Sequence, residues 1–283
     1  MADHSPTVKR RQLSMALLEL RKQRGLTAAE VTKRLDWTPS KLTRIERNDW
    51  KLPNPRDIRD LLDAYDVRDE AEREALIDLA KQARQRGWWA DCKDVFRGRL
   101  PAFEAGARVL RTFDHNIPGL LQGPDYMRAI FGAGSDLNEA AIERHVEARL
   151  ARQEILERDD PPQLMTVIDE AALHRLIGGP DVMQAQLEHL IKMGERPNVT
   201  IQVLPFTAGA HEALAGGFVI LDFESDGASS LVYTETPTDD IYREKPPDVH
   251  RYTVIFGTVQ AQALSAEESA QRVQSRIRDL QKR

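Results

Sequence analysis

Hydrophobic positions in the first 86 residues recur at the three- and four-residue spacing of short amphipathic helices. Leu13, Leu17 and Leu20 share one helical face, which predicts a first helix over residues 11–24, ended by Gly25. The same spacing predicts four more helices, over residues 28–34, 39–47, 56–64 and 69–86. Five short helices with brief connections indicate a mainly α N-terminal domain, which we place at residues 8–83.

Two helix starts follow each other closely in this domain. Thr27 with Glu30 three residues later is a capping box, and Thr38 before Pro39 is a second start. Asp36 lies at the corner between the two helices and is one of the few residue types that tolerate a positive φ. Two short helices joined by such a corner are typical of a helix-turn-helix.

The second helix of this motif exposes short hydroxyl groups and long cations, carried by Ser40, Lys41, Thr43 and Arg44. These residue types reach base edges and phosphates, so the predicted partner is double-stranded DNA. The alternative is a helical protein-binding domain of the same shape, for which a face of Glu and Leu would be expected. Glu46 is interpreted as an internal partner for an arginine on a neighbouring helix.

The N-terminal residues also match a family pattern, carried by Gly25, Leu26, Thr27, Glu30, Val31, Leu35, Ser40, Leu42, Arg44, Ile45, Glu46 and Pro53. Over about residues 10–66 the chain resembles the Xre-type helix-turn-helix family. The resemblance implies that four residues face the major groove, namely Pro39, Ser40, Lys41 and Arg44, with Arg44 reading a guanine. The implied phosphate contacts are Thr27, Thr38, Thr43 and Lys51.

Charge is divided unevenly along the chain. Residues 1–60 hold 14 Lys and Arg against 8 Asp and Glu, a net charge of +6. Residues 100–283 hold 18 against 28, a net charge of −10, so the total of −5 conceals a basic N-terminal module. This division suits a DNA reader that carries a separate regulatory domain.

Composition narrows the class of protein. The 283 residues are 41% hydrophobic and 30% charged, as in globular proteins, and no run of 18 apolar residues predicts a transmembrane helix. Cys92 is the single cysteine, which excludes an intramolecular disulfide and a cysteine-based zinc site. We expect a cytoplasmic protein, associated with the nucleoid when bound to DNA.

The pattern changes after residue 100 and predicts an α+β domain over residues 101–283. One helix is predicted through Phe103, Val109, Leu110 and Phe113, and another over residues 139–158, whose Glu- and Arg-rich face is interpreted as solvated. Strands are predicted at residues 165–168, 199–204, 218–223 and 231–235. Helices over residues 171–176, 182–193, 249–264 and 266–283 would flank a small mixed sheet.

Residues 84–100 form a predicted linker that contains two adjacent tryptophans, Trp88 and Trp89. Each carries about 150–250 Å² of largely apolar surface, which is costly to leave in water. We expect them to dock between the domains, or else to contact a partner protein.

Three separated motifs carry a second resemblance: residues 86–89, residues 117–122 with Tyr126, and residues 196–206 followed by His211. Together they resemble actinobacterial Xre-type regulators with an antitoxin-like C-terminal domain of unknown function. The match runs over about residues 10–280. It implies a DNA-binding regulator that is often paired with a small, separately encoded protein.

Candidate chemistry in the C-terminal domain centres on the loop at residues 205–217. A possible ligand or partner pocket is formed by Asp169, His211, Glu212, Tyr233 and Glu235. The chain has no zinc-binding His pair flanking a Glu, phosphate-binding loop or nucleophile elbow. We therefore expect no enzyme activity, catalytic residue, cofactor or metal. The alternative is a ligand-sensing regulator or an enzyme tethered to DNA.

The predicted function is sequence-specific transcriptional regulation. A homodimer would place the third helix of each protomer in the major groove of a palindromic operator. The C-terminal domain would bind a small protein encoded by an adjacent gene, and no membrane partner is expected.

Overall fold

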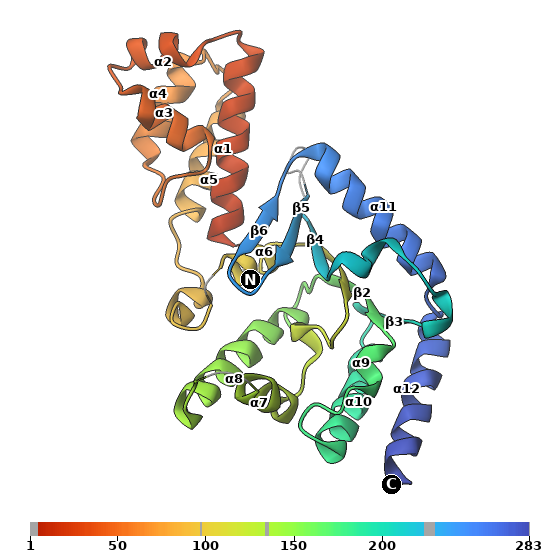
Figure 1. Ribbon diagram of the computed structural model, residues 1–283. Coiled ribbons are helices and arrows are strands. Elements are labelled where there is room, and N and C mark those ends of the chain that lie inside the picture. The colour runs from red at the N-terminus through yellow and green to blue at the C-terminus, as the bar shows by residue number, and fades with distance from the viewer. Residues whose placement is uncertain (1–4, 97, 134–135, 224–229, 283) are drawn as a thin grey trace. The chain divides into compact units, whose positions relative to one another are not determined.

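The computed structural model describes residues 5–96, 98–133, 136–223 and 230–282 (Figure 1). Contacts within the chain divide these residues into two units, one ending at Asp91 and the other starting at Cys92. The first unit is helical, and the second holds a β-sheet.

Five α-helices form the first unit: α1 (Pro6–Gln23), α2 (Ala28–Arg34), α3 (Pro39–Glu46), α4 (Pro55–Ala64) and α5 (Glu70–Gln82). The prediction of five helices over this region is confirmed. The first helix begins before the predicted residue 11 because Ser5 caps it, accepting a hydrogen bond from the Val8 amide at 3.3 Å. The last helix ends at Gln82, short of the predicted residue 86.

The core of this unit is built from the periodic positions of all five helices. Leu13 and Leu17 of α1 are fully buried against Leu42 of α3, Ile58 of α4 and Leu76 of α5. Trp37 and Trp50 pack against the edge of this cluster and are half-buried. The apolar side of α3 is therefore anchored, which leaves its opposite side for solvent or a ligand.

Positive φ angles set the corners of the helical unit, at Asp66 (φ 52°) after α4 and at three residues around α2 and α3. Gly25 has φ 65° after α1, Asp36 has φ 52° between α2 and α3, and Asn48 has φ 55° after α3. The predicted use of Asp36 at the corner is confirmed. Asp and Asn tolerate this region better than other side chains, so both turns form without glycine.

The second unit is organised around a six-stranded sheet with the order β3-β2-β1-β4-β5-β6. Its strands are β1 (Val109–Asp114), β2 (Gln163–Asp169), β3 (Val199–Leu204), β4 (Phe218–Asp222), β5 (Leu231–Glu235) and β6 (Asp240–Arg243). Strand β1 runs parallel to β2, and β2 runs parallel to β3, whereas β4, β5 and β6 pair antiparallel to their neighbours. The predicted mixed sheet in an α+β domain is confirmed.

Two parts of the predicted pattern are wrong. The single helix expected through Phe103 and Phe113 is a short helix, α6 (Leu100–Glu104), followed by β1 at the centre of the sheet. Strand β6 was not predicted, because it is only four residues long, begins and ends with a charged residue, and lies at an edge of the sheet.

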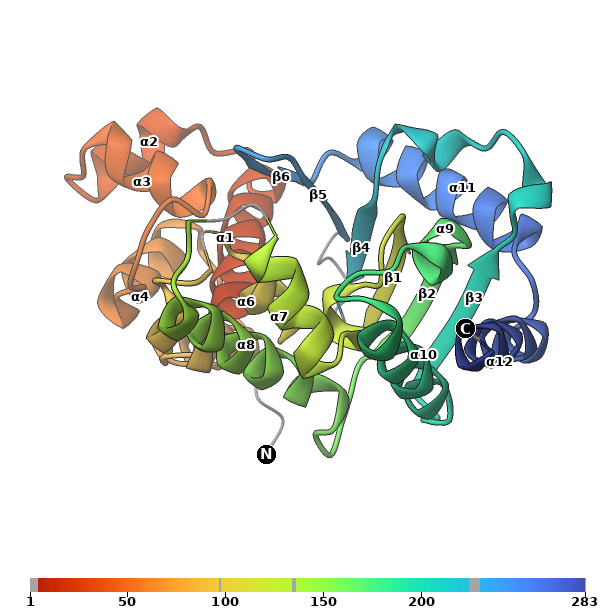
Figure 2. The same ribbon diagram turned by 60° about the horizontal axis from the view of Figure 1, so that its bottom comes forward.

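Helices cover both faces of the sheet (Figure 2). Helix α11 (Pro246–Gln262) packs over β1, β3, β4 and β5, with Phe256 and Val259 in the core. The other face is covered by α7 (Pro124–Gly132), α8 (Glu139–Gln153) and α10 (Pro180–Gly194). The short α9 (Ala171–His174) follows β2, and α12 (Ala266–Gln281) packs against α10 and β3. The one-turn helix η2 (Gly119–Leu121) lies before α7.

Candidate DNA-binding surface and C-terminal polar residues

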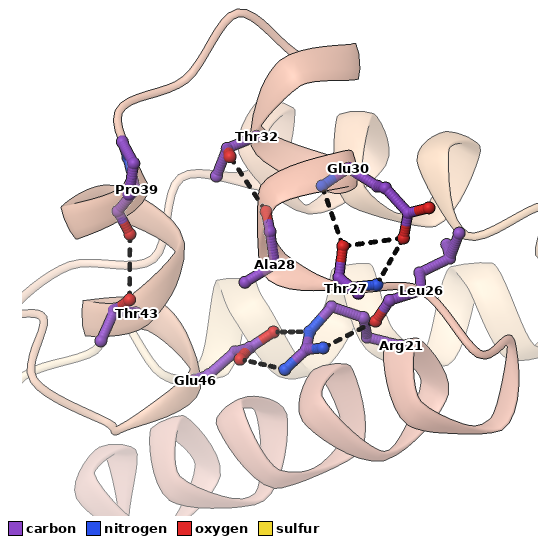
Figure 3. Close-up of polar contacts among 9 residues, drawn as sticks. All are labelled: Arg21, Leu26, Thr27, Ala28, Glu30, Thr32, Pro39, Thr43 and Glu46. Carbon is purple, nitrogen blue, oxygen red and sulfur yellow. Dashed lines mark hydrogen bonds and ion pairs between the residues drawn. The ribbon is translucent and has the colours of Figure 1, made fainter.

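The start of α2 is fixed by both hydrogen bonds of the predicted capping box (Figure 3). The Glu30 amide donates to Thr27 Oγ1 at 3.2 Å, and the Thr27 amide donates to Glu30 Oε2 at 2.8 Å. Hydrogen bonds from the backbone and side chain of Thr27 lower the pKa of the Glu30 carboxyl group. Thr27 is exposed, so the capped end of α2 lies at the surface.

Helix α3 starts differently from the prediction. Thr38 occupies the cap position before Pro39, but its side chain makes no capping hydrogen bond. Its Oγ1 lies 3.2 Å from Ser40 Oγ, and both residues are exposed. Thr43 is half-buried, and its hydroxyl donates to the Pro39 carbonyl at 2.9 Å (Figure 3). The two exposed hydroxyl groups therefore gather at the N-terminal end of α3.

The exposed side of α3 carries Pro39, Ser40 and Arg44, as predicted for a recognition helix. Lys41 differs, because it is held within the protein. Its Nζ lies 2.8 Å from Asp57 Oδ1 and 3.6 Å above the centre of the Trp37 ring. An ion pair with α4 was not visible in the local sequence, since Asp57 is 16 residues away.

Lys51 is exposed in the segment that follows α3. This segment is tied to α1 by Arg10, whose Nη1 donates to the Lys51 carbonyl at 3.1 Å. Nε of Arg10 also donates to Asn48 Oδ1 at 3.3 Å. Sequence reasoning gave Arg10 no role, although it lies in the basic run at residues 9–11.

The interpretation of Glu46 as an internal ion-pair partner is confirmed. Nε and Nη2 of Arg21 reach the two carboxylate oxygens of Glu46 at 2.5 and 2.8 Å (Figure 3). Nη1 of Arg21 donates to the Leu26 carbonyl at 2.7 Å, and the hydrogen bond to Glu46 raises the Arg21 pKa. One guanidinium group thereby joins α1, the start of the α2 segment and the end of α3.

The tryptophan pair lies in a one-turn helix, η1 (Trp88–Cys92). The two rings meet edge to face, with centroids 6.0 Å apart and planes at 80°. Both side chains are half-buried. A Cβ at Gly87 would lie 2.3 Å from the Trp89 ring, so glycine is required where that ring folds back. Docking of the pair between domains stays a prediction.

Two of the predicted pocket residues come together at the carboxyl end of β2. Nε2 of His211 lies 4.0 Å from Asp169 Oδ2, and His115 Nδ1 approaches the same oxygen at 3.8 Å. The Phe113 ring meets both imidazoles edge-on, at centroid distances of 5.1 and 5.4 Å. Burial lowers the His211 pKa and outweighs the opposite effect of Asp169, which favours a neutral imidazole.

The other three predicted pocket residues do not join this cluster. Glu212 Oε2 lies 3.4 Å from Arg251 Nη2 of α11, and Tyr233 donates its hydroxyl to Asp240 Oδ1 at 2.7 Å. Glu235 is exposed at the end of β5. The five residues therefore do not form one cluster. Within the described ranges, no group of three or more His, Cys, Asp or Glu side chains is placed to hold a metal ion.

A cavity of about 650 Å³ lies beside Tyr233 and Glu235, and its lining includes residues that sequence reasoning missed. These are Glu104, Asp114, Gln122, Arg149 and Arg152. The two arginines belong to the face of α8 that was interpreted as solvated, and that interpretation is wrong for them. Nothing in the Glu- and Arg-rich pattern of residues 139–158 distinguishes a cavity wall from a solvated face.

No described helix of the chain has the length and apolar character needed to cross a membrane. Searches of curated proteins and of solved structures give no match to the chain. A family model described as a helix-turn-helix domain matches residues 12–76, which indicates a DNA-binding regulator. A second model, described as a domain of unknown function (DUF5753), matches residues 97–275. That match covers more than half of the chain, which therefore belongs to the DUF5753 family.

Proposed function

We propose that this protein is a transcriptional regulator that binds a palindromic operator as a homodimer. Helix α3 of each protomer enters the major groove, and Arg44 reads a guanine there. Thr27, Thr38 and Lys51 contact phosphates around that groove, together with the hydroxyl of Thr43. The protein acts in the cytoplasm and associates with the nucleoid through this contact.

The observation that carries the proposal is the division of α3 into two sides. Leu42 and Ile45 are buried in the helical core, whereas Ser40 and Arg44 are exposed on the other side. A helix held by its apolar side presents its polar side in a fixed orientation, as readout of base edges requires. The net charge of +6 in residues 1–60 adds general attraction to the phosphate backbone.

A footprint on the DNA upstream of its own gene, followed by affinity measurements on variants, tests this assignment. Arg44→Ala should weaken operator binding by about 1–3 kcal/mol and relax the preference for one base pair. Lys51→Ala should weaken binding to operator and unrelated DNA alike. Lys81→Ala on α5, whose ammonium is paired with Asp78 at 2.7 Å, is the matched control. An unchanged footprint and affinity for Arg44→Ala would contradict the role of α3.

Dimerisation predicts a specific spacing in the footprint. Two copies of α3 that enter successive major grooves require half-sites about 34–36 Å apart, or a multiple of that distance. Sedimentation of the free protein and of its complex gives the stoichiometry independently of the footprint. A single protected half-site with one protein chain would refute the dimer.

In this proposal the second unit controls operator binding by the first and has no catalytic activity of its own. Glu212 is paired with Arg251, and Tyr233 donates to Asp240, so these groups are engaged in structural contacts. The regulatory input is a small protein encoded by an adjacent gene, which changes operator affinity when it binds residues 101–283. Adding that gene product to the footprint reaction tests this step. Unchanged protection and no complex on sedimentation would overturn it.

A further inference from the structure

The cavity in the second unit lies on the sheet face opposite α11. Register places Thr112, Val219 and Tyr233 side by side across β1, β4 and β5, and these residues form its floor. Helix α8 and the segment around η2 form the facing wall. The cavity has a volume of about 650 Å³. It adjoins a second cavity of about 630 Å³, and Arg149, Arg152 and Glu235 line both. This size is in the range of small-molecule sites.

Two guanidinium groups lie together in the facing wall. Arg149 and Arg152 are three residues apart on α8, so they project from the same side of the helix. A Cβ at Gly119 would lie 3.2 Å from Arg152 Nη1 and 3.8 Å from Arg149 Nε. Both cations therefore lie against the same bare stretch of backbone, where their charges repel each other.

One of the two cations is neutralised within the protein. Nε and Nη2 of Arg152 donate to the two carboxylate oxygens of Glu104 at 2.6 and 2.7 Å. The Glu104 side chain is 2% exposed, so this bidentate pair is shielded from water. A shielded, bidentate pair leaves Glu104 little capacity to balance a second cation.

The other cation has only neutral partners. Arg149 donates through Nη1 to Gln122 Oε1, and its guanidinium lies 4.5 Å above the Phe131 ring. No carboxylate of the described residues lies within ion-pair distance of it. Burial and the charge of Arg152 lower the Arg149 pKa to about 10, against the opposing charges of Glu235 and Glu104, so the group remains charged at neutral pH at a cost to the folded protein.

The position of Arg149 is fixed by surrounding hydrogen bonds. Gln122 is buried, and its Nε2 donates to the Ile117 carbonyl at 2.7 Å, which directs Oε1 toward Arg149. Gln153 donates to the carbonyls of Gly119 and Gln122 at 2.9 and 2.8 Å. A cation held in place with donors left over is preorganised for an anion.

The lining of the cavity also offers hydrogen-bond acceptors. Asp114 ends β1 and Glu235 ends β5, with Gly217 between them at the start of β4. A Cβ at Gly217 would lie 3.0 Å from the Phe113 carbonyl oxygen and 3.6 Å from Asp114 Oδ1. Glycine thus keeps the space beside Asp114 open. A ligand in the cavity would therefore meet both cations and carboxyl groups.

We propose that this cavity binds a small organic anion whose carboxylate or phosphate pairs with Arg149 and whose hydroxyl or amine groups donate to Asp114 and Glu235. The anion balances the charge of Arg149, which Glu104 does not, and the hydroxyl or amine groups of the ligand donate hydrogen bonds to the carboxyl groups of Asp114 and Glu235. The site is distinct from the DNA-binding surface, because every lining residue belongs to the second unit.

Calorimetric titration of the full chain tests the site with two probes, glycerol 3-phosphate and L-glutamate, at constant ionic strength. The first carries a phosphate with hydroxyl groups, and the second carries carboxylates with an amine, so the two arms distinguish the anion types. Saturable binding of either probe is expected, weakened at least tenfold in Arg149→Met. Arg128→Met is the matched control, since Arg128 pairs with Glu143 and Asp125 instead of lining the cavity. The affinity of Arg128→Met for each probe should stay within about twofold of the wild-type value.

A second variant tests the charge argument at the binding step. Gln122→Glu places a carboxylate against Arg149, at the loss of the hydrogen bond that Nε2 donates to the Ile117 carbonyl, and it should weaken probe binding at least tenfold. Absence of saturable binding of both probes, or equal binding by wild type and Arg149→Met, would overturn the proposal. Probe binding by Gln122→Glu as tight as by wild type would do the same. Operator affinity without a probe should be unchanged in all these variants, which separates this site from DNA binding.

Discussion

Arg21 and Glu46 form a bidentate ion pair that joins α1 to the end of α3. Their side chains are 14% and 9% exposed, so the pair is largely withdrawn from water. Leu42 and Ile45 hold the middle of α3 by apolar contact, and this pair holds its last turn. The orientation of the exposed side of α3 thus depends on an electrostatic contact as well as on the core.

Glu46→Gln should lower the free energy of unfolding of the helical unit by about 3 kcal/mol, because it leaves the Arg21 charge unpaired. All four tryptophans belong to this unit, so urea unfolding followed by tryptophan fluorescence reports on it. The double variant Arg21→Met with Glu46→Met should recover most of the loss, since it removes both charges. Exposed ion pairs contribute little to stability. A loss below about 0.5 kcal/mol for Glu46→Gln would therefore show that the Arg21–Glu46 pair is fully hydrated.

Asp57→Asn should strengthen DNA binding at all sequences. The substitution releases Lys41, whose ammonium now lies 2.8 Å from the Asp57 carboxylate, and removes a negative charge beside the DNA-facing helix. One additional phosphate contact should steepen the dependence of log affinity on log salt by about 1. Fluorescence anisotropy with operator and scrambled duplexes over a range of KCl measures both quantities. Asp60→Asn, at an exposed position of the same helix, is the control, and equal salt slopes for both variants would contradict this role of Asp57.

The two helix starts of the motif should respond differently to loss of a hydroxyl group. Thr27→Ala removes an observed capping bond and should cost about 1 kcal/mol of stability. Thr38→Ala should cost only a few tenths of that, because Thr38 makes no capping bond. Urea unfolding of both variants gives the comparison. Equal losses would mean that Thr38 caps α3 in solution.

Asp114→Asn should stabilise the second unit at pH 7 by about 1 kcal/mol, the scale of a buried polar group lacking full compensation. Burial raises the Asp114 pKa above 3.8, with Asn116 and His115 acting in the opposite direction. The folded state therefore binds a proton at Asp114 more tightly than the unfolded chain does. Stability falls as the pH rises from the unfolded pKa of 3.8 through the higher folded pKa. The gain from Asn should be full at pH 7 and shrink toward pH 4. Its amide oxygen can still accept from the Asn116 amide, as Asp114 Oδ1 does at 2.9 Å.

Chemical denaturation at several pH values, followed by far-ultraviolet circular dichroism, measures this gain. Glu235→Gln serves as the control at an exposed position of the same cavity and should change stability by less than about 0.5 kcal/mol. A gain for Asp114→Asn that is equal at pH 4 and pH 7 would show that it does not arise from the charge.

Local sequence signals were sufficient to predict the five helices of the first unit and the corner between α2 and α3. Caps and corners act within four residues, so Thr27, Glu30 and Asp36 could be assigned from sequence alone. The central strand β1 could not, because Phe103, Val109, Leu110 and Phe113 also fit a helical face. Its strand conformation is decided by pairing of Val109 with Gln163 and with Asp222, both more than 50 residues away.

The candidate sites divide in the same way. Ser40 and Arg44 could be predicted to lie on the exposed side of a helix from their spacing, and the structure leaves both exposed, whereas their contact with DNA stays a prediction. Arg149 was missed because α8 alternates Glu and Arg like any solvated helix. Its burial follows from the packing of η2 and the sheet around it, which no local pattern records. The predicted pocket set failed to converge for the same reason, since Glu212 and Tyr233 found partners in α11 and β6.

The strand order has a consequence for how the protein is made. The centre of the sheet joins β1, which ends at Asp114, to β4, which begins at Phe218, so a growing chain must be nearly complete before that pairing can form. Until then one edge of β1 exposes unpaired backbone N–H and C=O groups, which invites association between nascent chains. Truncation before residue 218 should therefore yield aggregates instead of a smaller stable domain.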